Sequence, residues 1–190
     1  LETRHQSFPG LNLTREVLAG QASRVHKEDT RVNPLLEAQV VEAADSMTYD
    51  AHDVDDALKL GLVTLEELHE QEMIKICVEL INQRVSDLGP EEYIRALIHT
   101  MVDCQVTNVL DHVGPFLAQS GWTSIRDVHQ ADYRIGTVGE LAEAKKAMET
   151  FLYERVYRHP ELVKTRERAQ SQIHSLFKTF VENPDPMPER

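Results

Sequence analysis

Carboxylate, phenol and imidazole side chains recur at helical spacing in one stretch of this chain, and together they could grip a metal ion and a sugar. At about 100° per residue, Asp45, Tyr49, His52 and Asp56 gather within about 60° of one another, with Asp53 beside them. A carboxylate suits a hard divalent cation. A phenol can stack on a ribose, and a second carboxylate can accept a hydrogen bond from a sugar hydroxyl. The alternative interpretation of the same pattern is a solvated acidic face.

The helix that carries these side chains must also present an apolar face to a core. Between Pro34 and about Leu60, apolar residues recur at steps of three and four, which is typical of one buried helical face. Proline suits the first position of such a helix. The predicted buried face, opposite the acidic one, consists of Val40, Ala44, Met47, Ala51, Val54 and Leu58.

Helical periodicity continues along most of the chain, and no run alternates apolar and polar residues as a strand would. Thr64 and Glu67 form the pattern of a capping box, which predicts a helix from there towards Gly89. Further helices are expected over residues 14–26, from Pro90 to a break at Gly114-Pro115, over 140–158 and over 161–182, with 119–139 irregular. The predicted fold class is therefore all-α.

Composition narrows the possible functions. The formal net charge is −12, which argues against a basic nucleic-acid footprint and against attraction to an anionic membrane surface. No apolar run approaches the ~18 residues of a membrane span, and the first residues lack the pattern of a signal peptide. We therefore expect a cytoplasmic protein. Cys77 and Cys104 fall on apolar helix faces, so both are predicted to be buried, reduced and slow to react with thiol reagents.

Four stretches of the sequence resemble, in order and spacing, the bacterial deoxyguanosine triphosphate triphosphohydrolase family of HD-domain phosphohydrolases. They cover residues 8–14, 36–57, 93–98 and 151–160. The resemblance implies an all-α, HD-domain-like helical bundle. It also implies metal-dependent hydrolysis of a deoxynucleoside triphosphate (dNTP) to the deoxynucleoside and inorganic triphosphate.

Carried over residue by residue, the resemblance makes Asp45 the last ligand of the family's H…HD…D metal site. It makes Tyr49 and Asp53 contacts of the deoxyribose. His52 and Asp56 remain candidates from the helical pattern, and Arg95 is a candidate for approaching the nucleotide. The pair His52-Asp53 is not the metal-binding dyad, because in the family that dyad lies upstream on a different helix. No catalytic residue is assigned.

The same resemblance implies a divalent cofactor, Mg²⁺ or Mn²⁺, with Fe or Ni as alternatives from ligand type. The implied partners are a dNTP substrate, a dNTP effector and further copies of the chain in a tetramer or hexamer. The family's first histidine and HD dyad precede the segment where this chain begins. We therefore expect residues 1–70 to be the inner part of the catalytic domain, 71–182 a helical region of the same unit and 183–190 a loose tail. Alone, such a fragment is predicted to be inactive.

Self-association is also suggested by the apolar content of the closing helices. They carry more apolar side chains than a small domain is expected to bury: Phe151, Leu152, Val156, Leu176, Phe177, Phe180 and Val181. Two other functions stay open. One is a non-catalytic helical interaction module, and the other is an HD phosphohydrolase that acts on a different nucleotide.

Overall fold

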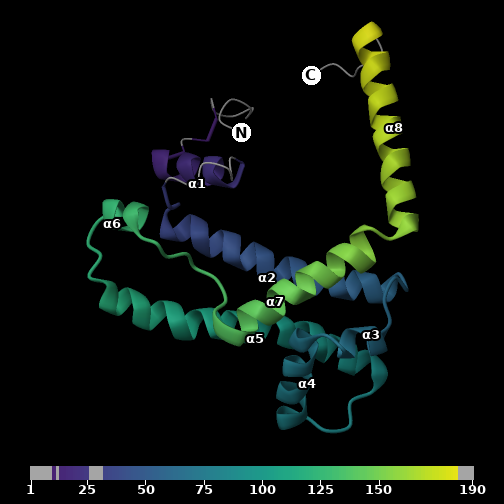
Figure 1. Ribbon diagram of the computed structural model, residues 1–190. Coiled ribbons are helices and arrows are strands. Elements are labelled where there is room, and N and C mark those ends of the chain that lie inside the picture. Colours follow the sequence, from purple (N-terminus) through teal and green to yellow (C-terminus); the bar gives the residue numbers. More distant parts are fainter. Residues whose placement is uncertain (1–9, 12, 26–31, 184–190) are drawn as a thin grey trace.

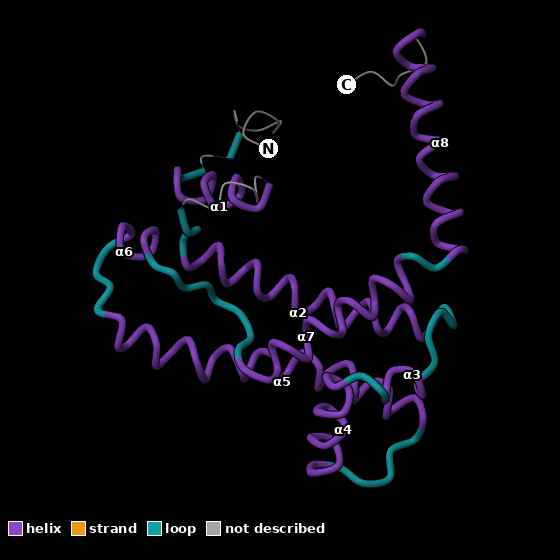
Figure 2. Tube along the Cα trace, viewed as in Figure 1, coloured by secondary structure: helices purple, strands orange, loops and turns teal. Residues whose placement is uncertain are grey.

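Every regular element in the described part of the chain is a helix (Figures 1 and 2). The computed structural model describes residues 10–11, 13–25 and 32–183. The predicted all-α fold is confirmed. The first half holds α1 (Arg15–Val25), α2 (Leu36–Lys59), α3 (Leu65–His69) and α4 (Glu72–Arg84). The second half holds α5 (Pro90–Ser120), α6 (Ile125–Gln130), α7 (Gly139–Leu152), the π-helix η1 (Tyr153–Tyr157) and α8 (Pro160–Glu182). The predicted loose tail lies, except for Asn183, outside the described residues.

The long helices α2 and α5 pack against each other, and α7 packs across α2 and α4 (Figure 1). Between them lies the main core, which draws its buried side chains mainly from α2, α4, α5 and α7, with one each from α3 and η1. Its fully buried members include Ala51, Val54, Leu68, Met73, Ile74, Cys77, Leu97 and Met101. The core therefore fixes α7 and η1 over the C-terminal half of α2.

The buried face of α2 differs from the predicted one in its first half. Val40 and Ala44 are exposed, whereas Gln39 is buried. The Gln39 amide explains the difference, because its Oε1 accepts a hydrogen bond of 2.9 Å from the Ile135 backbone N–H while its Nε2 donates to the Pro34 carbonyl. Burial of a side-chain amide costs little free energy when its oxygen and its nitrogen both form hydrogen bonds. From Met47 onwards the predicted face is confirmed.

The capping box is present, but the helix that it opens is short. The Glu67 backbone N–H donates to Thr64 Oγ1 at 3.2 Å, and the Thr64 N–H donates to Glu67 Oε2 at 2.9 Å. Helix α3 ends at His69, and Gln71 has an extended backbone before α4 begins. The prediction of one helix from Thr64 to Gly89 was therefore wrong. The bend at Gln71 allows buried side chains on both of its sides to enter the same core.

Helix α5 runs through Gly114-Pro115, where a break was predicted. A proline inside a helix removes one backbone hydrogen bond and crowds the carbonyl four residues earlier. That carbonyl belongs to Asp111, an exposed residue that water can reach. Just beyond the proline, Phe116 stacks on Tyr133 with ring centroids 3.7 Å apart and meets Trp122 edge-on at 5.3 Å. These aromatic contacts hold the last turn of the helix in place.

Helix α8 extends away from the rest of the molecule (Figure 1). None of its residues is buried, and it touches the body chiefly at η1. Among the described helices, none combines the length and the apolar character needed to cross a bilayer.

Candidate functional site

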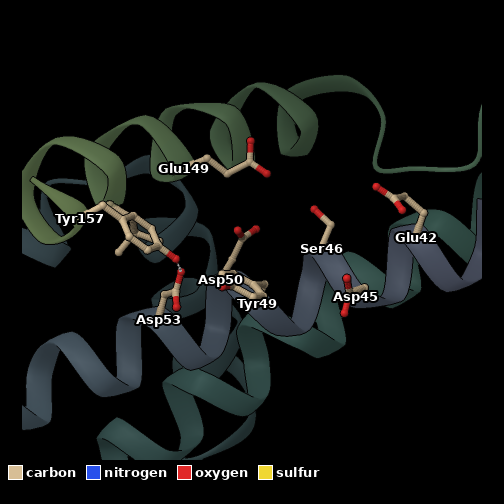
Figure 3. A pocket seen from close by; sticks show the side chains of 9 residues that line it. Glu42, Asp45, Ser46, Tyr49, Asp50, Asp53, Glu149 and Tyr157 are labelled. Atoms are coloured by element: carbon tan, nitrogen blue, oxygen red, sulfur yellow. Dashed lines mark hydrogen bonds between the residues drawn. The ribbon is translucent and has the colours of Figure 1, made fainter. Parts of the chain in front are cut away.

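A cleft of about 320 Å³ opens between α2 and the segment formed by α7 and η1 (Figure 3). Apart from the apolar Leu152, its lining is polar and mostly acidic. The lining residues are Glu42, Asp45, Ser46, Tyr49, Asp50, Asp53, Glu149, Leu152 and Tyr157. The helical repeat explains why so many come from α2, since side chains three and four residues apart share one face.

Tyr157 closes one end of the cleft by donating a hydrogen bond from its hydroxyl to Asp53 Oδ2 (Figure 3). The tyrosine is the last residue of the π-helix, whose wider turn is closed by a bond from the Arg158 N–H to the Tyr153 carbonyl. Burial raises the pKa of Tyr157, and the neighbouring Asp53 carboxylate raises it further. The phenol therefore stays protonated at neutral pH and can act as a donor.

A nearly buried ion pair ties the two walls together beneath the cleft. Lys145 Nζ of α7 lies 2.5 Å from Asp50 Oδ2 of α2, and their side chains are 12% and 8% exposed. The same ammonium also contacts Glu149 Oε1. Burial raises the pKa of Asp50 above its ordinary value, and Lys145 opposes that rise. Lys145 thus holds Asp50 and Glu149 in place from below.

The six residues predicted from the sequence fall into two groups. Asp45, Tyr49 and Asp53 line the cleft together, and Tyr49 is 60% exposed. His52 and Asp56 are exposed on α2 but do not belong to the lining. Arg95 is exposed on α5 and does not reach the cleft either. The structure brings together the three residues that the resemblance assigned to metal and sugar.

Six polar residues of the site were missed by sequence reasoning: Glu42, Ser46, Asp50, Lys145, Glu149 and Tyr157. Tyr157 stands inside the stretch 151–160 that carried the resemblance, so a signal for it existed. Nothing in the sequence links Asp50 to Lys145, because they are 95 residues apart.

The donor set favours cations and hydroxyl groups. Five carboxylates face the cleft, and Lys145 beneath them is already engaged by two of them. An anionic phosphate would be repelled there without a bound cation, whereas a sugar hydroxyl finds acceptors in Asp53 and a phenol in Tyr157. Within the described ranges, no three His, Cys, Asp or Glu side chains come close enough to hold a metal ion. These residues therefore do not form a metal site by themselves, although Asp45 offers one carboxylate.

Comparison with known proteins finds similarity to phosphohydrolase-related proteins. Residues 136–190 match the family described as a phosphohydrolase-associated domain. Several curated proteins are similar along the chain, and each is named a deoxyguanosinetriphosphate triphosphohydrolase-like protein. The one from Leptospira interrogans is 27% identical over 100% of this chain and 53% of its own length. The one from Geobacter metallireducens is 30% identical over 100% and 52%, and the one from Bordetella pertussis is 32% identical over 99% and 52%.

The chain therefore spans about half the length of the curated relatives that it matches. These matches confirm the family resemblance inferred from the four sequence stretches.

Proposed function

Because this chain is a relative of the deoxyguanosinetriphosphate triphosphohydrolase-like proteins over its whole length, we propose that it forms the sugar-binding part of a dNTP triphosphohydrolase. The proposed reaction converts a dNTP to the deoxynucleoside and inorganic triphosphate. The observation that carries the proposal is the convergence of Tyr49 and Asp53 of α2 and Tyr157 of η1 on one cleft. A solvated acidic face would not require a second helix to cover it with a half-buried phenol that is bonded to one of its carboxylates.

Each of these side chains has a distinct proposed task. Asp53 accepts a hydrogen bond from a deoxyribose hydroxyl, and Tyr157 holds the Asp53 carboxylate in the orientation for doing so. Tyr49, which is exposed at the mouth of the cleft, lies against the face of the sugar ring. A phenol ring packed closely there leaves no room for a further hydroxyl, which would disfavour ribonucleotides.

The proposal gives Asp45 one ligand position of a divalent metal and leaves the other positions to residues outside the described set. A bound Mg²⁺ or Mn²⁺ would supply Lewis-acid polarisation of a phosphate oxygen. It would also neutralise the repulsion that the acidic cleft exerts on a phosphate chain. The remaining α2 carboxylates of the lining, Glu42 and Asp50, add to the negative electrostatic potential of the cleft.

The test measures products as well as turnover. The protein at its full natural length is incubated with each dNTP in the presence of Mg²⁺, Mn²⁺, Fe²⁺ or Ni²⁺. We expect inorganic triphosphate and deoxynucleoside as the products. Release of phosphate or pyrophosphate would point instead to another phosphohydrolase reaction, and a lack of turnover under every condition would favour the interaction module.

A pair of tyrosine variants distinguishes a role of Tyr157 in substrate binding from a general effect of substitutions in η1. Tyr157→Phe removes the bond to Asp53 and should weaken substrate binding by about 1 kcal/mol, which raises KM about fivefold. Tyr153→Phe is the matched control, because Tyr153 lies on the same π-helix but is exposed and does not line the cleft. Equal effects of the two substitutions would contradict the assignment of Tyr157.

A further inference from the structure

The two cysteines of the chain meet between α4 and α5, away from the acidic cleft. Cys77 Sγ and Cys104 Sγ are 3.9 Å apart. The Cys104 thiol also lies 3.4 Å from the Met101 carbonyl, to which it can donate. The thiols come from two helices that pack along each other, so the pairing depends on the tertiary fold. A disulfide between them would require the sulfur atoms to approach to the bonding distance of about 2.05 Å.

The two thiols differ sharply in access to solvent. Cys77 is fully buried in the main core, next to side chains of the α2–α4–α7 packing. Cys104 is only half buried, so the expectation that both cysteines are buried holds for Cys77 alone. Cys104 lines an open groove of about 530 Å³ whose walls are α4, α5 and the start of α7, and Cys77 does not reach that groove. A small reagent can therefore reach one sulfur and not the other.

The electrostatic surroundings of the pair also favour reaction at Cys104 before Cys77. A hydrogen bond from the Cys77 thiol lowers the pKa of Cys104, and the same pairing together with burial raises the pKa of Cys77. The neighbouring Asp103 carboxylate opposes ionisation of Cys104. Arg84 lies 2.9 Å from Asp103 across the groove and reduces this effect. The accessible thiol is thus the one that ionises first, and the thiolate is the reactive form.

We propose that Cys104 and Cys77 form a peroxide-sensitive thiol pair, in which Cys104 is oxidised first through the groove and Cys77 resolves it to a disulfide that joins α4 to α5. In the first step the Cys104 thiolate attacks one oxygen of hydrogen peroxide. An S–O bond forms, the O–O bond breaks, and the departing hydroxide takes up a proton to become water. Cys104 becomes a sulfenic acid.

In the second step the Cys77 sulfur attacks the Cys104 sulfenic sulfur. An S–S bond forms, the S–O bond breaks, and hydroxide leaves with the Cys77 proton as a second water molecule. One peroxide thus oxidises two thiols. Because Cys77 is packed among core side chains, the new bond would tie the groove wall directly to the core that supports α7.

The experiment treats the folded chain with hydrogen peroxide and follows its intact mass and its free thiols. We expect both thiols to disappear together, the mass to fall by two hydrogen atoms, and digestion to yield one peptide pair that joins position 77 to position 104. Dithiothreitol should restore both thiols. Independent oxidation of the two cysteines, a disulfide between two copies of the chain, or thiols that survive peroxide would each overturn the proposal.

Two variants test the order of the steps. In Cys77→Ala, Cys104 should accumulate as a sulfenic acid that a 1,3-diketone reagent traps. In Cys104→Ser, Cys77 should resist peroxide because the core covers it. Peroxide modification of Cys77 in that variant would overturn the assigned order. Far-ultraviolet circular dichroism establishes that each variant is folded, and the wild-type mass measurement decides the proposal even where Cys77→Ala fails to fold.

Discussion

At the scale of single residues, the pair formed by Asp50 and Lys145 joins the stability of the fold to the geometry of the cleft. Both side chains are almost fully covered, and Lys145 is the cation that holds α7 against the acidic face of α2. Removing one member of a buried pair leaves the other charge uncompensated, which is far more costly than losing an exposed ion pair.

We predict that Lys145→Met lowers the free energy of unfolding by about 3 kcal/mol, measured by urea denaturation at neutral pH. Lys146→Met is the matched control, since Lys146 is the exposed neighbour of Lys145, and it should change stability by less than about 0.5 kcal/mol. The double variant Lys145→Met/Asp50→Asn should recover much of the loss. If the double variant were as unstable as Lys145→Met, packing rather than charge would explain the effect.

The pH dependence of the Lys145→Met variant follows from Asp50. Burial raises the folded pKa of Asp50 above its ordinary 3.8. As pH rises past 3.8 the unfolded chain loses this proton first, so the folded state binds more protons and stability falls with rising pH until the folded pKa is passed. Without Lys145 that folded pKa rises further, and the fall extends to higher pH. Melting curves of variant and wild type should therefore diverge as pH increases from about 4.

Asp45 and Met47 should show opposite responses to substitution, although they lie two residues apart. Asp45 is exposed at the cleft, so Asp45→Ala should leave the melting temperature nearly unchanged while it abolishes metal binding and turnover in the active protein. Met47 is 4% exposed, so Met47→Asp buries a charge and should cost several kcal/mol, about 3 or more. Near-normal turnover and metal content in Asp45→Ala would refute its proposed role. Ala44, which we expected to share the core position of Met47, is exposed and cannot serve as the comparison.

At the scale of elements, helix α3 and η1 meet through one glutamate that has two tasks. Glu67 completes the capping box with Thr64 and also contacts Arg155 of the π-helix. The cap therefore helps to locate η1, which in turn carries Tyr157 to the cleft.

We predict that Thr64→Ala lowers the free energy of unfolding by about 1 kcal/mol, because the Glu67 backbone N–H loses its acceptor. Thr64→Ser keeps a hydroxyl at the same position and should retain most of the stability. Thermal denaturation of the two variants decides the point. A Thr64→Ser protein as unstable as Thr64→Ala would show that the methyl group, and not the hydrogen bond, matters.

Local patterns predicted the elements better than they predicted which faces the elements bury. The Thr64 cap and the proline that begins α5 are local signals, and both mark real helix starts. The burial of Gln39 could not be predicted, since its partner is a backbone N–H at Ile135. The continuation of α5 past Pro115 likewise depends on aromatic rings that the fold brings to Phe116. The same limit applies to the site. Most of the predicted residues lie on α2, whereas Lys145, Glu149 and Tyr157 come from α7 and η1, which only the fold brings next to α2.

At the scale of the whole molecule, α8 is the element that the rest of the chain leaves uncovered. Its exposed apolar side chains include Ile173, Leu176, Phe177 and Val181, which recur at helical spacing on one side. The helix carries four basic and three acidic side chains, whereas the chain as a whole has a net charge of −12. A second copy of this chain thus offers two kinds of partner to α8. The α8 helix of the second copy can cover the apolar side chains, and its acidic surface can pair with the basic side chains.

We predict that the chain self-associates through α8, so that light scattering at micromolar concentration gives a mass that is a multiple of 21.7 kDa. Phe177→Asp should shift the protein towards the monomer, because it places a charge in the apolar face. Gln172→Asp, an exposed polar position on the same helix, is the control and should leave the assembly intact. A monomeric wild-type chain would contradict the prediction.

The π-helix has a consequence for how insertions and deletions would affect the cleft. A hydrogen bond from the N–H of residue i+5 to the carbonyl of residue i encloses one more residue than the corresponding bond of an α-helix. The side chains that follow this turn are therefore rotated back by about 100° about the helix axis, relative to the same positions in a continuous α-helix. Tyr157, at the end of this turn, is therefore set back from the direction that position 157 would have in an unbroken α-helix. Loss of one exposed residue such as Glu154 would let the turn close as an α-helix with the phenol still facing Asp53. The segment therefore contains one residue more than an α-helical turn would need. Tyr157 reaches Asp53 because of its direction about the helix axis, and not because of the number of residues in the segment.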